Sequence, residues 1–314
     1  MTTAVPISFP AAGGIIGPPA GSGIIGPSAE GGITLRGERW GDGGPPVLFT
    51  QGNGFSVQSY RDAFSAVTGR VAVHALNSRG HGGSDVPPNL DTWDGMVEDL
   101  RRYLKAHFTA PILVAGHSMG ATVSLRLAAE SPELVSGLLL MEPNLVRGRR
   151  DVWPGNDGGI QQEMIQGAAK RRDRWNNRAE AAAWLRERGT YRDWAEGPFN
   201  AFIESALVDD GAAVRLACPP WLESQAYATL PDAVMFRWAD TLRVPAVVVR
   251  AEQSPVVSAN GLEDFIRAVP IAVVLHVKGS HSFPMQHPQS AGAAIAMGLD
   301  ILLRGTQQRS AQSA

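Results

Sequence analysis

Residues 111–121 constrain the fold of this chain more than any other segment. They read Pro-Ile-Leu-Val-Ala-Gly-His-Ser-Met-Gly-Ala, so an apolar run leads into the pattern Gly-x-Ser-x-Gly, and an amphipathic stretch follows to residue 130. The apolar run is typical of a buried strand, and the amphipathic stretch is typical of a helix. Between a strand and a helix, this pattern predicts a tight, strained turn that lifts a serine hydroxyl above a sheet. Ser118 is therefore a candidate nucleophile.

Short apolar runs and amphipathic stretches alternate through most of the chain. Strands are predicted at 47–50, 71–76, 112–115, 135–141, 244–250 and 272–277, and helices at 58–67, 93–107, 119–130, 258–268 and 288–303. Several of these runs are almost continuously apolar, which is typical of parallel strands buried on both faces. The alternation predicts an α/β fold with a mostly parallel, twisted sheet flanked by helices. A chain of 314 residues, 44% of them hydrophobic, is long enough for one such core.

This alternation stops over residues 144–242, where the strand pattern is missing. Six of the eight tryptophans lie in that stretch, and helices are predicted at 161–175, 179–188 and 200–208. We expect a helical cap here, inserted between the core segments 31–143 and 243–305. Such a cap covers the carboxyl edge of the sheet, where α/β proteins bind their ligands.

The two ends of the chain differ from the core in composition. Residues 1–30 are rich in Gly, Pro, Ala and Ser, and the string Gly-Ile-Ile-Gly-Pro occurs at 14–18 and again at 23–27. We expect an extended or mobile N-terminal arm. Its paired isoleucines leave docking on a second subunit, and hence a homo-oligomer, open. Residues 306–314 are expected to form a C-terminal tail.

Composition excludes several classes of protein. The charges nearly balance, with 28 basic and 30 acidic residues, so the basic surface of a nucleic-acid-binding protein is not expected. No apolar run approaches the roughly 20 residues that cross a bilayer, and the N-terminus does not resemble a signal peptide. The single cysteine, Cys218, excludes an intrachain disulfide and a thiolate metal cluster. We therefore expect a cytoplasmic protein that binds a small molecule rather than nucleic acid or membrane.

Two glycine-rich turns follow other predicted strands. The segment Gln51-Gly52-Asn53-Gly54-Phe55 can present backbone N–H groups to an oxyanion. We prefer the N–H of Asn53 there, with those of Gly54 and Phe55 as competitors. The N–H of Met119, at the start of the helix after the serine, is the expected second donor. The other turn, 78–85, is expected to shape the site from below, and its histidine, His81, is not expected to be the catalytic base.

A nucleophilic serine needs a general base, and that base needs a carboxylate. The chain order Ser, acid, His of this motif class requires a late histidine, and His281 lies in the turn before the final predicted helix. Glu142, at the end of the strand 135–141, is the favoured acid. Glu252, near the end of the strand 244–250, is the alternative, and an incomplete triad is also left open.

Four segments together resemble α/β-hydrolase-fold proteins in type and order. They are Gln51-Gly52-Asn53-Gly54-Phe55, Arg79-Gly80-His81-Gly82-Gly83-Ser84, Gly116-His117-Ser118-Met119-Gly120 and Gly279-Ser280-His281-Ser282-Phe283-Pro284. The resemblance covers about residues 33–304 and implies that His281 is the base. It also implies an aspartate where this chain has Ser254, which cannot supply a fixed charge. Residues 214–223 resemble a recurring cap segment of a poorly characterised bacterial branch, in which a histidine usually stands in place of Gln51.

These residues predict a serine hydrolase that acts on a carboxylic ester, lactone or related acyl substrate without a metal or organic cofactor. Ser118 would attack, His281 would carry the proton and Glu142 would orient His281, while Asn53 and Met119 would hold the oxyanion. The same fold also supports C–C bond hydrolysis, acyl transfer, cofactor-free oxygenation or ligand binding without catalysis.

The expected cap bears on the choice of substrate. Its tryptophans either line a largely apolar pocket or pack the cap helices against one another. We expect Arg171, Arg172, Arg174 and Arg178 to form a solvated helix face rather than a carboxylate clamp. Glu223 is expected to stay out of the pocket.

Overall fold

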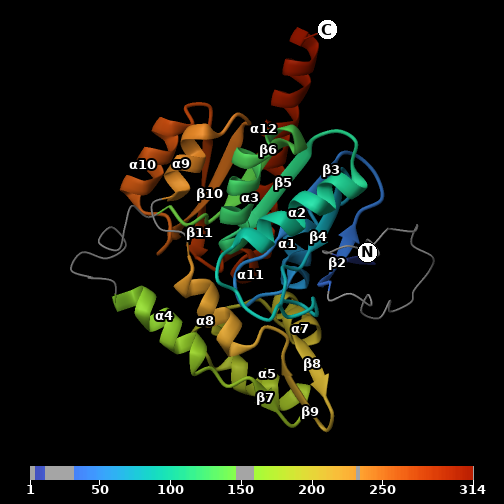
Figure 1. Ribbon diagram of the computed structural model, residues 1–314, viewed down its shortest axis with the longest axis vertical. Coiled ribbons are helices and arrows are strands. Elements are labelled where there is room, and N and C mark those ends of the chain that lie inside the picture. The colour runs from blue at the N-terminus through green and yellow to red at the C-terminus, as the bar shows by residue number, and fades with distance from the viewer. Residues whose placement is uncertain (1–3, 11–31, 146–158, 231–233, 314) are drawn as a thin grey trace.

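An eight-stranded sheet forms the centre of the molecule (Figure 1). The computed structural model describes residues 4–10, 32–145, 159–230 and 234–313. The strand order is β1-β2-β4-β3-β5-β6-β10-β11; β2 runs antiparallel to both of its neighbours, and every other neighbouring pair is parallel. The strands are β1 (Val5–Pro10), β2 (Thr34–Trp40), β3 (Pro46–Thr50), β4 (Ala72–Leu76), β5 (Ile112–His117), β6 (Val135–Met141), β10 (Ala246–Gln253) and β11 (Val273–Ser280). The predicted mostly parallel sheet is confirmed.

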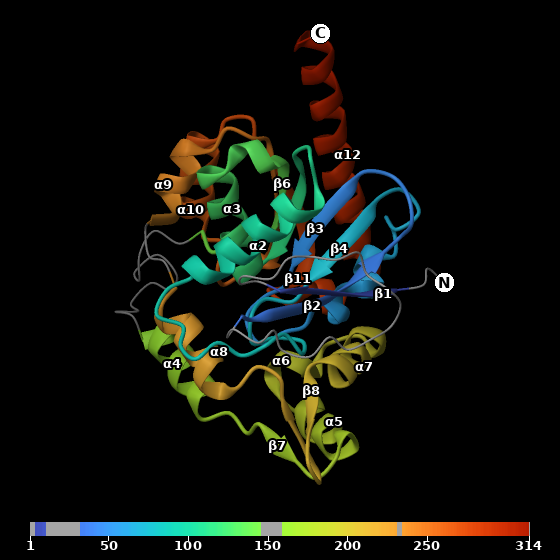
Figure 2. The same cartoon turned by 45° about the vertical axis from the view of Figure 1, so that its right-hand side comes forward.

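Helices cover both faces of this sheet and bury a hydrophobic cluster on each (Figure 2). On one face lie α2 (Asp94–His107), α3 (Met119–Glu130), α9 (Val234–Thr241) and α10 (Ala259–Ala268). On the other face lie α1 (Arg61–Phe64) and α12 (Pro288–Ser313). The short helices η1 (Val57–Tyr60), η2 (Pro132–Leu134) and α11 (Phe283–Gln286) complete the core. All six residues of β5 are buried, as expected for a central strand covered on both faces.

The register of the sheet brings four strand ends together at one edge. Thr50 at the end of β3 pairs with Gly116 on β5, and His117 at the end of β5 pairs with Met141 on β6. Met141 in turn pairs with Val249 on β10. The residues that follow these positions therefore share the carboxyl edge, which is where α/β sheets carry their functional groups.

Both chain ends differ from the expectation of an arm and a tail. Val5–Pro10 forms β1, which pairs with β2, and Phe9 is buried against the ring of Tyr103 at a centroid distance of 5.2 Å. The arm therefore starts as an edge strand, because Val5, Ile7 and Phe9 alternate with smaller residues. The two Gly-Ile-Ile-Gly-Pro strings lie outside the described residues. At the other end, α12 continues as far as Ser313, beyond the expected start of the tail, and projects past the sheet (Figures 1 and 2).

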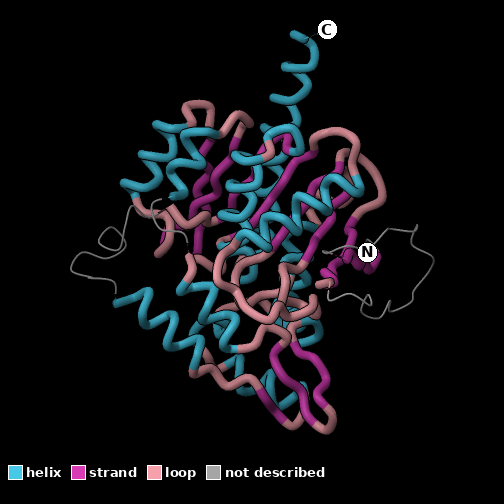
Figure 3. The backbone as a smooth tube through the Cα atoms, viewed as in Figure 1, coloured by secondary structure: helices cyan, strands magenta, loops and turns pink. Residues whose placement is uncertain are grey.

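Residues 159–230, which we call the insert, lie against the carboxyl edge of the sheet and combine helices with a small sheet (Figure 3). The helices are α4 (Gly159–Ala169), α5 (Arg178–Arg186), α6 (Gly189–Arg192), α7 (Glu196–Ser205) and α8 (Pro220–Ala228). Strands that were not predicted for this segment accompany the helices: β7 (Arg174–Trp175), β8 (Leu207–Asp210) and β9 (Ala213–Leu216) pair in the order β7-β9-β8. β8 and β9 form a hairpin whose two-residue turn starts at Gly211, with a φ of 67°.

The expected boundary of the insert at residue 242 is wrong. Helix α9 packs against α3 and α10 and buries Ala239 in the same hydrophobic cluster, so it belongs to the core. No helix in the described part of the chain is long and apolar enough to cross a membrane.

Candidate active site

Ser118 occupies the sharp turn between β5 and α3. Its backbone has a φ of 54° and a ψ of −118°, a conformation that costs free energy for a residue with a side chain. The turn requires glycine on both sides, because a Cβ on Gly116 would collide with the backbone of Gly120, and one on Gly120 would collide with the carbonyl of Thr50. The N–H of Ser118 donates to the carbonyl of Met141 at 2.9 Å, which ties the turn to β6. The serine is partly exposed, so a reactant can reach it.

His281 lies in the turn after β11 and joins this serine to a carboxylate. Its Nε2 is 2.9 Å from Ser118 Oγ, and its Nδ1 is 3.2 Å from Glu142 Oε2. The histidine side chain is 23% exposed, whereas that of Glu142 is fully buried. The geometry allows the hydroxyl of Ser118 to pass a proton to Nε2 while Glu142 accepts the N–H at Nδ1.

Glu142 is held from both sides by β10 and the loop that follows it. Its Oε1 accepts the N–H of Ala251 at 2.7 Å, and its Oε2 accepts the hydroxyl of Ser254 at 2.6 Å. Its φ is 49°, and among the described residues only Ser118 and Glu142 combine a side chain with a positive φ of this kind. Strain of this kind is typical of functional positions. The alternative acid, Glu252, is exposed, and no hydrogen bond joins it to His281 in the described part of the chain.

The loop after β3 lies beside the serine, since a Cβ on Gly52 would lie 3.2 Å from Ser118 Cβ. The N–H of Gly54 donates to His81 Nε2 at 3.0 Å, and that of Phe55 donates to the carbonyl of Gly52 at 3.2 Å. The N–H of Asn53 has no partner among the described residues, and the same is true of Met119, at the first position of α3. These are the two donors preferred from the sequence, and the competitors Gly54 and Phe55 are occupied.

Two buried side chains hold this loop from below. His81 accepts the Gly54 N–H, and its own Nδ1 lies 3.0 Å from the carbonyl of Arg79, so the proton is on Nδ1. Burial lowers the pKa of His81 below 6.5, which keeps Nε2 available as an acceptor. Gln51, in place of the usual histidine, is fully buried, and its Oε1 accepts the N–H of Ser78 at 3.3 Å. His81 therefore supports the loop, whereas the hydrogen-bond partner of Ser118 Oγ is His281.

The insert contacts the same loop through a buried ion pair. Glu223 on α8 accepts from Arg171 at 2.6 Å, and the two side chains are only 9% and 15% exposed. The backbone carbonyl of Glu223 accepts Asn53 Nδ2 at 3.0 Å, and a Cβ on Gly54 would lie 2.9 Å from Glu223 Oε1. The expectation of a solvated helix face is therefore wrong for Arg171, which follows the end of α4 and turns inward. Glu223 thus contacts the loop after β3, and its expected position outside the substrate pocket stays a prediction.

The other arginines predicted on the helix face, and most of the tryptophans described within residues 144–242, do not contact the loop after β3. Arg172 and Arg174 are exposed and Arg178 is partly exposed, and the three form ion pairs with Glu180, Asp210 and Asp209, respectively. Trp175 and Trp184 pack against each other within the insert, and Trp221 is exposed at its surface. Trp238 lies on α9 in the core, and Trp153 lies outside the described residues. Trp194 differs, because its ring lies 5.2 Å from that of Phe55 in the loop after β3.

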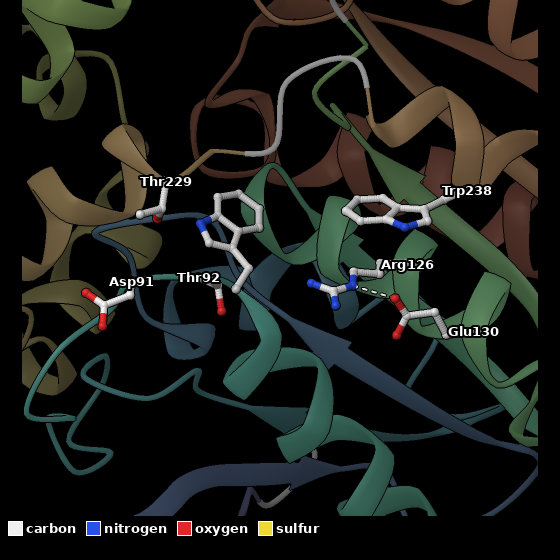
Figure 4. A pocket seen from close by; sticks show the side chains of 7 residues that line it. Asp91, Thr92, Arg126, Glu130, Thr229 and Trp238 are labelled. Carbon is white, nitrogen blue, oxygen red and sulfur yellow. Dashed lines mark hydrogen bonds and ion pairs between the residues drawn. The ribbon is translucent and has the colours of Figure 1, made fainter.

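A separate cavity of about 330 Å³ lies on the α3 side of the core (Figure 4). It is lined by Asp91, Thr92, Trp93, Arg126, Glu130, Thr229 and Trp238. Arg126 donates to Glu130 at 2.7 Å and stacks on Trp238 at 5.3 Å, so its charge is already paired. None of Ser118, His281 and Glu142 lines this cavity. No group of three or more His, Cys, Asp or Glu side chains in the described ranges could hold a metal ion.

Two residues of the site, His117 and Tyr60, were not singled out from the sequence, and the contact made by a third, Ser254, was not expected. Ser254 binds the carboxylate of Glu142, and His117 and Tyr60 form a hydrogen bond behind the serine. His117 could have been noted because it occupies the variable position directly before Ser118. Ser254 was noted only as a position without the implied aspartate, and the sequence around Tyr60 does not reveal what Tyr60 contacts.

Comparison with known proteins identifies the family. The sequence matches the alpha/beta hydrolase fold family over residues 45–288, which is most of the chain, so the chain belongs to that family. It is similar to a pimeloyl-[acyl-carrier protein] methyl ester esterase of Chromobacterium violaceum, with 32% identity over 111 residues, or 35% of this chain. This match spans only 42% of the length of the esterase.

Two further likenesses extend over most of the chain. A 2-(acetamidomethylene)succinate hydrolase of Mesorhizobium japonicum is 24% identical over 256 residues, covering 80% of this chain and 86% of that protein. The crystal structure of an E-2-(acetamidomethylene)succinate hydrolase superposes with a TM-score of 0.72 and 23% identity, covering 85% of this chain and 96% of the other. At this identity the likeness supports the fold alone.

Proposed function

We propose that this chain is a serine hydrolase that cleaves a carboxylic ester or a related acyl substrate through an acyl-enzyme. The observation that carries the proposal is the chain of contacts from Ser118 Oγ to His281 Nε2 at 2.9 Å and from His281 Nδ1 to Glu142 Oε2 at 3.2 Å. A hydroxyl, an imidazole and a buried carboxylate in this order form the arrangement by which a serine becomes a nucleophile.

The reaction follows from these positions. Ser118 Oγ attacks the carbonyl carbon as its proton moves to His281 Nε2, and Glu142 stabilises the resulting imidazolium. The free N–H groups of Asn53 and Met119 donate to the oxyanion of the tetrahedral intermediate. His281 then protonates the leaving group, and the ester of Ser118 remains. A water molecule, deprotonated by His281, attacks that ester and releases the acid. This chemistry requires no metal or organic cofactor.

Two arguments support an ester with a largely apolar acyl or alcohol group. A relative with 32% identity is named an ester esterase, and the family membership makes hydrolysis the expected class of reaction. In addition, the rings of Phe55 and Trp194 meet beside the proposed oxyanion hole at 5.2 Å, and both side chains are largely buried. The insert that carries Trp194 would then act as a cap over the substrate.

The proposal is tested with p-nitrophenyl acetate and a fluorophosphonate probe. The wild-type chain is expected to release p-nitrophenol with a burst equal to the amount of enzyme, and the probe is expected to label Ser118 covalently. Ser118→Ala should abolish both signals. Hydrolysis that survives Ser118→Ala would exclude the acyl-enzyme. A folded wild-type protein that takes no label would favour ligand binding without catalysis.

A further inference from the structure

His117, the residue directly before Ser118, uses both of its ring nitrogens inside the protein. Its Nδ1 lies 2.7 Å from the hydroxyl of Tyr60, and its Nε2 lies 2.8 Å from the backbone carbonyl of His281. The side chains of His117 and Tyr60 are completely buried. The His117 ring thus links the end of β5 to the turn that carries the proposed base, His281.

The direction of these hydrogen bonds is determined by the partners. A carbonyl oxygen can only accept, so Nε2 of His117 carries the proton and donates to His281. Nδ1 is then an acceptor and receives the hydroxyl proton of Tyr60. The oxygen of Tyr60 in turn accepts the N–H of Gly52 at 3.3 Å. The result is one directed chain from Gly52 through Tyr60 and His117 to the backbone of His281.

Burial keeps this chain in one protonation state. It lowers the pKa of His117 well below 6.5, and the nearby His281 lowers it further. Burial also raises the pKa of the Tyr60 hydroxyl well above its ordinary value of 10.0. Both side chains are therefore neutral near pH 7, and the proton stays on Nε2 of His117.

The chain connects the three parts of the site that must be aligned. Gly52 precedes Asn53, whose N–H is a proposed oxyanion donor, and a Cβ on Gly52 would lie 3.2 Å from Ser118 Cβ. His117 is covalently joined to Ser118. The carbonyl that His117 binds belongs to His281 itself. A displacement of about 1 Å between such groups can cost a hundredfold in rate.

We propose that His117, oriented by Tyr60, is a positioning residue that aligns His281 and the loop of Gly52 with Ser118. This inference rests on the proposed function. The competing explanation is that His117 only fills space, because its ring lies among those of Phe55, Tyr60, His281 and Phe283. A phenyl ring would fill that space equally well but could not donate to His281, so His117→Phe separates the two explanations.

The chain contains a matched control for this substitution. His74 on β4 lies 2.8 Å through Nδ1 from the hydroxyl of Tyr103 on α2, which is the same type of pair. Burial lowers the pKa of His74 to about 4, so this histidine is also neutral. It makes no contact with Ser118, His281 or the loop of Gly52 in the described part of the chain. His74→Phe therefore removes an equivalent pair without touching the site.

The experiment measures kcat and KM for p-nitrophenyl acetate, with thermal unfolding as a check on folding. We expect His117→Phe to lower kcat by about 10- to 100-fold with KM changed less than about threefold. His117→Gln can still donate an amide N–H to the carbonyl of His281. Its decrease in log kcat should therefore be at most about half of the decrease in His117→Phe. Tyr60→Phe should give a smaller loss, and His74→Phe should leave kcat within about twofold.

Two outcomes would overturn the inference. One is a wild-type kcat in folded His117→Phe, and the other is an equal loss of kcat in His74→Phe. If His117→Phe does not fold, Tyr60→Phe decides, since it removes one hydroxyl, and an unchanged kcat there would count against the inference.

A measurement without turnover separates this inference from the proposed function. Should the wild-type protein lack Ser118-dependent hydrolysis, the proposed function fails, and ¹⁵N spectra of the imidazole rings still test the positioning role. We expect His117 with its proton on Nε2, and we expect the His281 ring signals to shift in His117→Phe but not in His74→Phe. A proton on Nδ1 of His117, or unchanged His281 signals in His117→Phe, would contradict the positioning role.

Discussion

The ends of β6 and β10 lie side by side in the sheet but contribute different groups to the site. β6 is followed directly by Glu142, which is fully buried, has a φ of 49° and lies 3.2 Å from His281. β10 ends near Glu252, which is exposed, and is followed by Ser254, whose hydroxyl donates to Glu142 at 2.6 Å. The resemblance to α/β hydrolases implies an aspartate where Ser254 stands. In this chain the carboxylate comes from the neighbouring strand instead.

This difference shows that a histidine base needs a carboxylate at a particular position in the site, whichever strand supplies that carboxylate. Because Met141 pairs directly with Val249, residues that follow either strand reach the same side of His281. One strand end supplies the charge, and the other supplies the hydrogen bonds that hold it. Substitutions at these ends can break or reverse that division of roles.

Removal of the carboxylate should have the largest effect. Glu142→Ala leaves His281 without a partner at Nδ1, so we expect kcat for p-nitrophenyl acetate to fall by about 10³- to 10⁴-fold. Glu142→Gln, which keeps the shape and loses the charge, should fall nearly as far. Unfolding curves confirm that both variants fold. A kcat within about tenfold of wild type would remove Glu142 from the proposed triad.

A carboxylate placed on the other strand end should partly reverse this loss. In Glu142→Ala/Ser254→Asp the new carboxylate starts from the residue whose hydroxyl now lies 2.6 Å from Glu142 Oε2. We expect kcat to rise about 10- to 100-fold above that of Glu142→Ala, since the acid can act from either strand end. Ser254→Asn in the same background is the matched control without charge. An equal rise in that control would attribute the gain to packing.

Loss of the supporting hydroxyl alone should have a moderate effect. Ser254→Ala removes one of the two donors to Glu142 and a bond from the N–H of Val257 at 2.9 Å. Hydrogen bonds to charged groups contribute about 1.5–3 kcal/mol, so we expect kcat to fall about 10-fold and thermal stability to decrease. Ser254→Thr keeps a hydroxyl and should stay close to wild type in both measurements. If Ser254→Ala and Ser254→Thr have the same kcat and the same thermal stability, the action of Glu142 does not depend on the hydrogen bond from Ser254.

The smallest effect is expected at the exposed end of β10. Glu252→Ala should change kcat by less than about twofold, because an exposed carboxylate without contact to His281 cannot orient its ring. Steady-state hydrolysis of p-nitrophenyl acetate provides the measurement. A loss of kcat as large as that of Glu142→Ala would assign the acid to Glu252 instead of Glu142.

The sequence predicted the parts of this protein that depend on local pattern. The apolar run of β5 and the glycines around Ser118 predict the turn from the local sequence alone. The central strands were located because burial on both faces makes them apolar throughout. The edge strand β1 and its neighbour β2 were missed, since antiparallel strands alternate apolar and polar side chains and give a weaker pattern. The hairpin of β8 and β9 was missed for the same reason.

Tertiary structure decided everything that depends on distance between segments. The sequence favoured Glu142 and left Glu252 and an incomplete triad open, and only the fold brings Glu142 to 3.2 Å from His281. It also left three N–H groups in the loop after β3, and only the partners of Gly54 and Phe55 leave that of Asn53 free. The inward turn of Arg171 toward Glu223 was equally hidden. A backbone pattern depends on neighbours along the chain, whereas a hydrogen bond depends on atoms that folding brings together from distant positions.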